Sequence, residues 1–338
     1  MIFAGHPTAN IMKMKHIFWI FCLVFPTVVL GQDNYFTVVA QQGDGIFSIL
    51  RKEGLNPAKY YEEFVALNKE NLKNGSELHL GRTYRIPLAE DSFKKTGINI
   101  ALDSKQEEAI IETELAQMNH KSEKLKDAVI YLISGSDLLD ETPTNNSVTE
   151  EINKRLAKEL IVHGAKVYMI SSEKKTNPVK TGNLDDGTSE GAMADLAQMQ
   201  DYLETINKKF LQHTGKYQRL LITRVKGEIT NAYCDVSIYH HVASKDGKRI
   251  ANNIQNLFQE QSITRKTVDQ YKEIFTDKHN LYLAKNALPA ITLIELETSS
   301  EKSLENKSTM IVRSNKALFT DLIANGVLND YAELNLQD

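Results

Sequence analysis

From Asp127 to the end of the chain, short apolar runs alternate with stretches whose apolar residues recur every three or four positions. The first run, Ala128 to Ile133, is apolar at every position, so the strand that it forms must be buried on both faces. Further strand-like runs occupy 166–170, 220–223, 236–239 and 290–296. This alternation predicts an α/β domain with a central, mostly parallel sheet and helices on both faces.

Composition narrows the class of protein. The 338 residues are 41% apolar and 25% charged, which leaves room for two domains and excludes a fibrous or largely disordered chain. Forty basic and forty-four acidic side chains give a formal charge of −4, without the basic excess that nucleic-acid binding requires. Two cysteines can form neither a disulfide framework nor a zinc–thiolate cluster.

The N-terminal segment has the pattern of a secretory signal. Lys13 and Lys15 precede an apolar run at 17–30, and a small residue and a polar stretch follow it. A membrane anchor is the alternative, but the run is shorter than the roughly 20 residues that span a bilayer, and Pro26 interrupts it. We therefore expect residues 1–31 to be cleaved, and the mature chain to be exported without a transmembrane segment.

Two units follow, joined by a polar stretch. Residues 35–88 read as a strand, two helices and a closing strand, which makes a small unit able to fold alone. The sparse apolar residues of 89–126 indicate a linker. Residues 127–332 form the predicted α/β domain.

The first unit resembles a LysM module, a small carbohydrate-binding domain. The resemblance rests on its spaced Gly-Asp, Leu-Asn and Ile-Pro elements, at 43–46, 67–68 and 80–87. It implies binding of peptidoglycan or another glycan that contains N-acetylglucosamine. It also places the sugar between two loops, at Gly43, Asp44, Gly45, Ile46, Asn71 and Leu72. The plainer alternative is that Asp44 only caps a helix.

The second unit resembles the zinc-dependent N-acetylmuramoyl-L-alanine amidases, in the form that follows a LysM module in Bacteroidetes-type proteins. The matching segments are 129–135, 155–157, 163–170, 206–207, 217–220, 235–241, 281–283 and 289–296. Most of their residues belong to the scaffold, so the resemblance implies the fold more strongly than the activity. These enzymes cut the amide between muramic acid and the peptide stem.

The residues that the family uses for zinc have changed in this chain. The family provides two histidines and a glutamate as ligands, and a second glutamate as acid/base. The histidine positions hold Ser136 and Arg224, and the glutamate position holds Thr149, or Asn145 or Ser147 with a different gap. Only Glu295 matches, at the acid/base position. A guanidinium cannot ligate zinc and repels a cation beside it.

These substitutions predict a degenerate amidase, with no metal and no cofactor. Glu295 either keeps the family's acid/base position or is the ion partner of Arg224, since the ends of their two strands would converge on the same pocket. The chain would be a periplasmic or cell-wall protein that binds glycan and, through its second unit, binds or regulates an envelope partner. One alternative is an active zinc amidase with substitute ligands such as Asp137, His240 and a nearby glutamate. Another is a purely structural envelope protein tethered by its LysM module.

Overall fold

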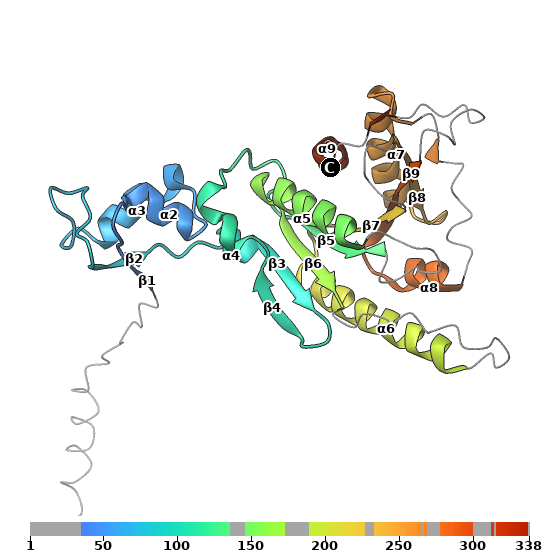
Figure 1. Cartoon of the computed structure of the whole chain (residues 1–338), viewed down its shortest axis with the longest axis horizontal. Helices are drawn as coiled ribbons and strands as arrows, with labels where there is room; N and C mark the ends of the chain where they lie inside the picture. The colour runs from blue at the N-terminus through green and yellow to red at the C-terminus, as the bar shows by residue number, and fades with distance from the viewer. Residues whose placement is uncertain are drawn as a thin grey trace, which may run out of the picture.

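The central sheet is built from strands that are buried on both faces, as the first apolar run predicts. The computed structural model describes residues 35–135, 146–172, 189–226, 233–264, 267–268, 278–299, 312–313 and 316–336. Within them, an eight-stranded sheet has the order β10-β8-β9-β7-β5-β6-β3-β4 (Figure 1). The strands are β3 Gly97–Ala101, β4 Gln106–Ala109, β5 Ala128–Ser134, β6 Lys166–Ser171, β7 Tyr217–Lys226, β8 Tyr233–His240, β9 Ala290–Ser299 and β10 Val312–Arg313. The central strands β9, β7, β5, β6 and β3 run parallel, and β4, β8 and β10 add antiparallel pairings at the edges.

Helices cover both faces of this sheet, which confirms the predicted α/β class (Figure 1). One face packs against α5 (Asn146–Val162), α7 (Lys245–Glu260) and α9 (Lys316–Asn335), and the other against α6 (Ser189–Gln212) and α8 (Lys278–Asn286). Alternate side chains of β5 enter the two cores, because successive residues of a strand point to opposite faces. Ile130 and Leu132 face α5, whereas Tyr131 and Ile133 face α6.

The N-terminal unit has the predicted order of strand, helix, helix and strand. Its elements are β1 (Phe36–Val39), α2 (Ile46–Lys52), α3 (Pro57–Leu67) and β2 (Thr83–Ile86), and β1 pairs antiparallel with β2. A separate core of buried side chains holds the unit together. Its large side chains that are almost fully buried are those of Ile49, Leu50, Phe64 and Tyr84.

Residues 89–126 correct the sequence interpretation, because they are not a free linker. They contain α4 (Phe93–Thr96), the strands β3 and β4, and the 3₁₀ helix η1 (Glu112–Gln117). β3 extends the central sheet by parallel pairing with β6, and β4 forms its outer edge. Glu107 and Glu108 on β4 oppose further strand pairing, as charges on an edge strand commonly do.

The same segment fixes the N-terminal unit against the α/β domain. The Phe93 amide donates to the Gly54 carbonyl at 2.9 Å, and the Ser92 hydroxyl donates to the Glu53 carbonyl at 2.9 Å. A Cβ added at Gly54 would lie 3.2 Å from the side chain of Leu115 on η1, so the two surfaces are in close contact at Gly54. Phe93 and Leu115 belong to the core that packs against α5.

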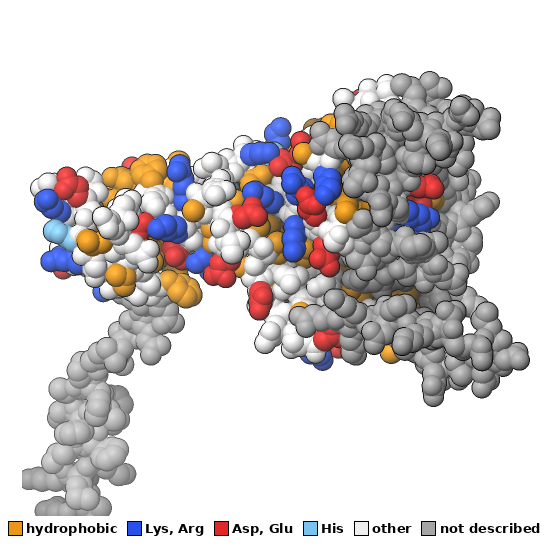
Figure 2. All heavy atoms as spheres, viewed as in Figure 1, with side chains coloured by type: hydrophobic (Ala, Val, Ile, Leu, Met, Phe, Trp, Pro, Cys, Tyr) orange, Lys and Arg blue, Asp and Glu red, His pale blue; other side chains and the backbone are white. Residues whose placement is uncertain are grey.

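The outer surface of α5 carries charges of both signs, which Figure 2 shows as interleaved blue and red side chains. The ion pairs there include Lys158 with Glu114 and Lys121 with Glu159. Among the described residues, none of the helices is both long enough and apolar enough to span a bilayer. The predicted signal at 1–31 lies outside the described residues.

Candidate functional site

Arg224 and Glu295 meet at the carboxyl edge of the parallel strands. They are direct register partners on β7 and β9. Both side chains point to the α6/α8 face, where they continue the apolar rows of Leu220 and Ile222 on β7 and of Leu293 on β9. In open α/β sheets this edge is where ligands commonly bind.

The two side chains form a buried ion pair, which is one of the two roles expected for Glu295 from the sequence. The Arg224 Nε donates to Glu295 Oε2 at 2.9 Å, and an Nη of the same guanidinium also reaches Oε2. The Arg224 side chain is 8% exposed and that of Glu295 6%. Lys226 lies two residues further along β7 and donates to Glu295 Oε1 at 3.0 Å. Both oxygens of the one carboxylate are therefore engaged by cations.

β8 adds polar groups to this site. Ser237 is the register partner of Glu295, and Tyr239 lies two residues further along the same face. Burial, together with the negative charge of Glu295, raises the pKa of Tyr239 to about 12, so its phenol stays neutral at physiological pH. Lys226, Ser237 and Tyr239 were not among the residues predicted from the sequence. Side chains on one face of a strand recur every two residues, so Lys226 could have been predicted from Arg224. Ser237 and Tyr239 required knowledge of how β8 pairs with β9.

The remaining predicted zinc positions are only partly described. Ser136, Asp137 and Asn145 lie outside the described residues. The end of β5 lies beside Arg224, because a Cβ added at Gly135 would be 3.0 Å from the Arg224 Cβ. Thr149 is fully buried on α5, the helix that packs on the face opposite Arg224 and Glu295.

The described residues do not fit a zinc ion. A guanidinium stands at one of the positions where the family resemblance predicts a histidine, and the carboxylate paired with it already accepts from two cations. His240, a ligand in the active-enzyme alternative, has the same parity on β8 as Val236 and Ile238, so it points to the face opposite Glu295. Its Nδ1 lies 2.9 Å from the His241 carbonyl oxygen. No group of three or more His, Cys, Asp or Glu residues suited to a metal occurs within the described part of the chain.

The predicted glycan loop at 43–46 is held by the side chain of Asp44. Its carboxylate accepts from the Gln41 amide at 2.9 Å, the Ser48 hydroxyl at 3.2 Å and the Lys52 ammonium at 2.6 Å. With only 5% exposure, this carboxylate organises the loop. It does not cap α2, whose N-cap residue is Gly45 and which has no side-chain cap, so the plainer alternative for Asp44 is wrong in that detail. Ile46 is buried beneath the loop, and a Cβ added at Gly43 or Gly45 would meet no atom within 4 Å.

The second predicted loop is held by Tyr84. The Tyr84 hydroxyl donates to the Asn71 carbonyl at 3.3 Å and accepts from the His79 amide at 2.6 Å. Asn71 is exposed, and Leu72 is half-buried against the core of the unit. The loop turns at Gly75, whose φ is +80° and whose Cβ direction is open. Backbone groups of both loops thus border open space.

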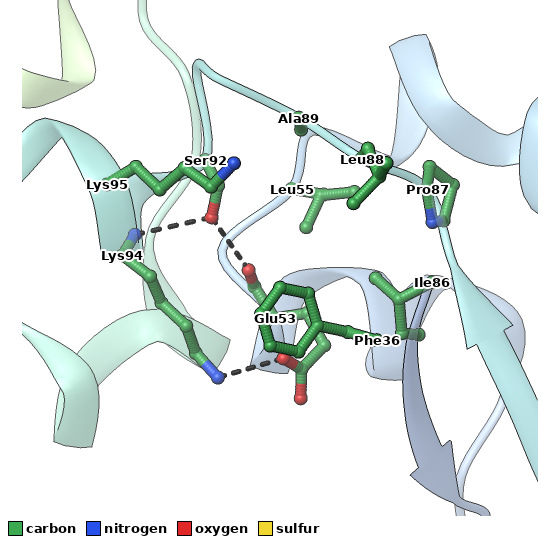
Figure 3. Close-up of a pocket in the computed structure, with 10 residues that line it drawn as sticks. All are labelled: Phe36, Glu53, Leu55, Ile86, Pro87, Leu88, Ala89, Ser92, Lys94 and Lys95. Carbon is green, nitrogen blue, oxygen red and sulfur yellow. Dashed lines mark hydrogen bonds and ion pairs between the residues drawn. The ribbon is translucent and has the colours of Figure 1, made fainter. Parts of the chain in front are cut away.

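The pocket in Figure 3 lies elsewhere, at the junction between the N-terminal unit and α4. It is mostly apolar and has a volume of about 170 Å³. Lys94 at its rim pairs with Glu53 at 2.8 Å, and Lys95 pairs with Glu90 at 2.8 Å. None of the predicted glycan or zinc positions lines this pocket.

Comparison with known proteins finds neither a family model nor a curated protein that matches the chain. The CwlD amidase from Clostridioides difficile, solved in complex with the GerS lipoprotein, is 13% identical with a TM-score of 0.39, over 62% of this chain and 99% of that one. Cwp6 from Clostridium difficile is 14% identical with a TM-score of 0.34, over 60% of this chain and 29% of that one.

The catalytic domain of CwlV, an N-acetylmuramoyl-L-alanine amidase from Bacillus (Paenibacillus) polymyxa var. colistinus, is 9% identical. Its TM-score is 0.31, over 62% of this chain and 98% of that one. With TM-scores this low, these likenesses carry no weight for function, and the proposals below rest on the chain's own residues.

Proposed function

We propose that this chain is an exported cell-envelope protein that binds peptidoglycan through residues 35–88. Its amidase-like α/β domain would hold no zinc and hydrolyse nothing, and would instead bind or regulate an envelope partner. The observation that carries the proposal is the buried pair of Arg224 and Glu295 at the edge where the family's zinc and acid/base would lie.

The chemistry of that pair favours binding over hydrolysis. Zinc-assisted amide cleavage needs three protein ligands, an open position for water and a carboxylate that moves protons. The Arg224 guanidinium repels a divalent cation, and Glu295 is held by Arg224 and Lys226. A positive group at the metal position and an occupied carboxylate remove two requirements of the reaction together.

Metal content and cleavage of muropeptides test the absence of hydrolysis. We expect the purified full chain to contain no stoichiometric zinc and to leave muropeptides intact after zinc is added. The variant Ser136→His/Arg224→His should bind zinc more tightly than the native chain, because it restores two imidazole ligands. Ser136→Gln/Arg224→Gln is the matched control, with the same charge change but no imidazole. Stoichiometric zinc in the native chain, removed by a chelator with loss of cleavage, would overturn the proposal.

The glycan half of the proposal rests on the open backbone of the two loops. Gly45 has a φ of −118°, which any residue can adopt, and its Cβ direction is open. Gly45→Phe should therefore fold normally and block a sugar from the loop. Sedimentation with purified sacculi should show at least roughly tenfold weaker binding, equivalent to the loss of one or two hydrogen bonds.

Thr37→Phe, at an exposed position on β1, is the matched control and should bind sacculi like the native chain. If Gly45→Phe and the native chain sediment equally, glycan does not bind at this loop. If the native chain itself fails to sediment, peptidoglycan is not its ligand.

A further inference from the structure

A cluster of lysines lies at the opposite edge of the sheet, where β6 begins and α6 ends (Figure 1). Lys166 is the first residue of β6, and its Nζ lies 5.7 Å from the centroid of the Tyr168 ring. Lys209 on α6 places its Nζ 5.1 Å from the same centroid. Lys216 immediately precedes β7, two strands away from Lys166 in the same sheet. The fold thus brings cations from three segments together.

The acids of the cluster are already used by other lysines. Lys209, whose side chain is 12% exposed, donates to Glu107 at 2.7 Å. Lys216 donates to Asp127 at 2.9 Å. In the described part of the chain, no ion pair or hydrogen bond reaches the Nζ of Lys166. The Tyr168 ring lies at a distance close to the limit of about 6 Å for a cation–π contact. The carboxylates of Glu90 and Glu107 also attract Lys166, but they are paired with Lys95 and Lys209.

Lys166 is therefore a half-buried cation among like charges. Burial, and next the charge of Lys209, lower its pKa, because both disfavour the ammonium form. Beside it, the Tyr168 hydroxyl and the His213 Nε2 lie 2.8 Å apart and add further hydrogen-bonding groups. A half-buried ammonium whose pKa is lowered, and which no hydrogen bond or ion pair from the described residues holds, is a candidate for a binding site.

We propose that Lys166, Lys209 and Lys216 form a binding site for a small oxyanion of the phosphate or carboxylate class. An oxyanion would supply the charge that Lys166 lacks, and ammonium groups bind such anions as point charges. The site lies at the amino edge of the parallel strands, away from Arg224 and Glu295. It does not depend on the proposed glycan binding or on the absence of hydrolysis.

Titration of the full chain with inorganic phosphate, at low and constant ionic strength, tests the site. Calorimetry and thermal melting should detect phosphate binding by the native chain, and a parallel titration with acetate separates the two anion classes. Lys166→Met should melt at a higher temperature than the native chain without phosphate, because a poorly solvated cation is removed. The same variant should bind phosphate about tenfold more weakly, as expected for one lost charge-assisted contact.

Lys121→Met is the matched control, because Lys121 is exposed and paired with Glu159 on another surface. It should bind phosphate like the native chain. Lys216→Met is a second test, because the Lys216 side chain is 43% exposed and its replacement should not impair folding. This variant should also bind phosphate more weakly than the native chain. The proposal is overturned if neither anion binds the native chain, if Lys166→Met binds as tightly as Lys121→Met, or if Lys166→Met melts at a lower temperature without phosphate.

Discussion

Replacing Glu295 with glutamine should destabilise the α/β domain. The substitution keeps the shape of the side chain and removes the negative charge that Arg224 and Lys226 share. Removing one partner of a buried ion pair costs about 3–5 kcal/mol, because the other charge stays buried without compensation. We expect about 3 kcal/mol, the lower end of that range, because the Lys226 side chain is 30% exposed and can turn toward water.

Thermal melting followed by calorimetry measures this effect. For a domain of this size, about 1 kcal/mol shifts the melting temperature by about 2–4 °C, so Glu295→Gln should melt about 6–12 °C below the native chain. The double variant Arg224→Met/Glu295→Leu is the control. It should melt close to the native chain, since replacing both members of a buried pair with apolar residues is often neutral or stabilising.

Two results would contradict this reasoning. If Glu295→Gln melts like the native chain, the pair does not contribute to stability in the way that its burial indicates. If Glu295→Gln retains the native melting temperature but abolishes a muropeptide cleavage that the native chain performs, Glu295 acts as a catalytic acid and the domain is an enzyme.

Three further outcomes follow from other contacts. Asp330 is fully buried and accepts hydrogen bonds from two arginines and a tyrosine. Asp330→Asn should therefore lower the free energy of unfolding by about 3–5 kcal/mol, measured by calorimetry. An unchanged melting temperature would refute a stabilising role for this network. Gly54→Ala should lower the free energy of unfolding by about 1–2 kcal/mol from its φ of +73° alone. The loss should exceed that of Gly81→Ala, whose φ is +76° but whose Cβ direction is open. Equal losses of stability in the two variants would exclude a contribution from contact with α4 and η1. Burial acts to raise the pKa of Asp44, but the Lys52 ammonium and the loop donors lower it below 3.8 overall. Because the pKa of Asp44 is lower in the folded chain, the stabilisation is present above the unfolded pKa and is lost as pH falls through the folded pKa. NMR of the native chain should therefore show the 41–46 loop intact at pH 5 and loosening well below pH 4. The loop of Asp44→Asn should show no such change with pH.

The sequence predicted those parts of the fold that depend on uninterrupted local patterns. β5 could be recognised because all seven of its residues are buried and so had to be apolar or small. The pair of Arg224 and Glu295 could be foreseen because each residue follows an apolar run, and the ends of neighbouring parallel strands meet at one edge. Asp44 was placed correctly on its loop, but only the structure shows that its oxygens face the loop's own donors.

The sequence could not show that β3 and β4 belong to the sheet. β3 has only five residues, in which Ile98 and Ile100 flank the single polar residue Asn99, too few to distinguish a strand from a polar linker. The partner of β3 is β6, whose paired residues lie about seventy positions later, so the pairing is non-local. The lysine cluster was missed for the same reason, since Lys166, Lys209 and Lys216 are close only after folding.

The contacts of Gly54 with α4 and η1 have a consequence for the proposed binding of an extended glycan. A module on a flexible tether samples many distances, and its effective concentration at a second binding surface falls gradually as the tether lengthens. Here the first unit packs directly on the second, so the polymer proposed to bind the first unit would reach the second at one fixed distance and angle. Avidity would then depend on whether the spacing of the polymer's repeating units matches the fixed distance between the two units of the protein.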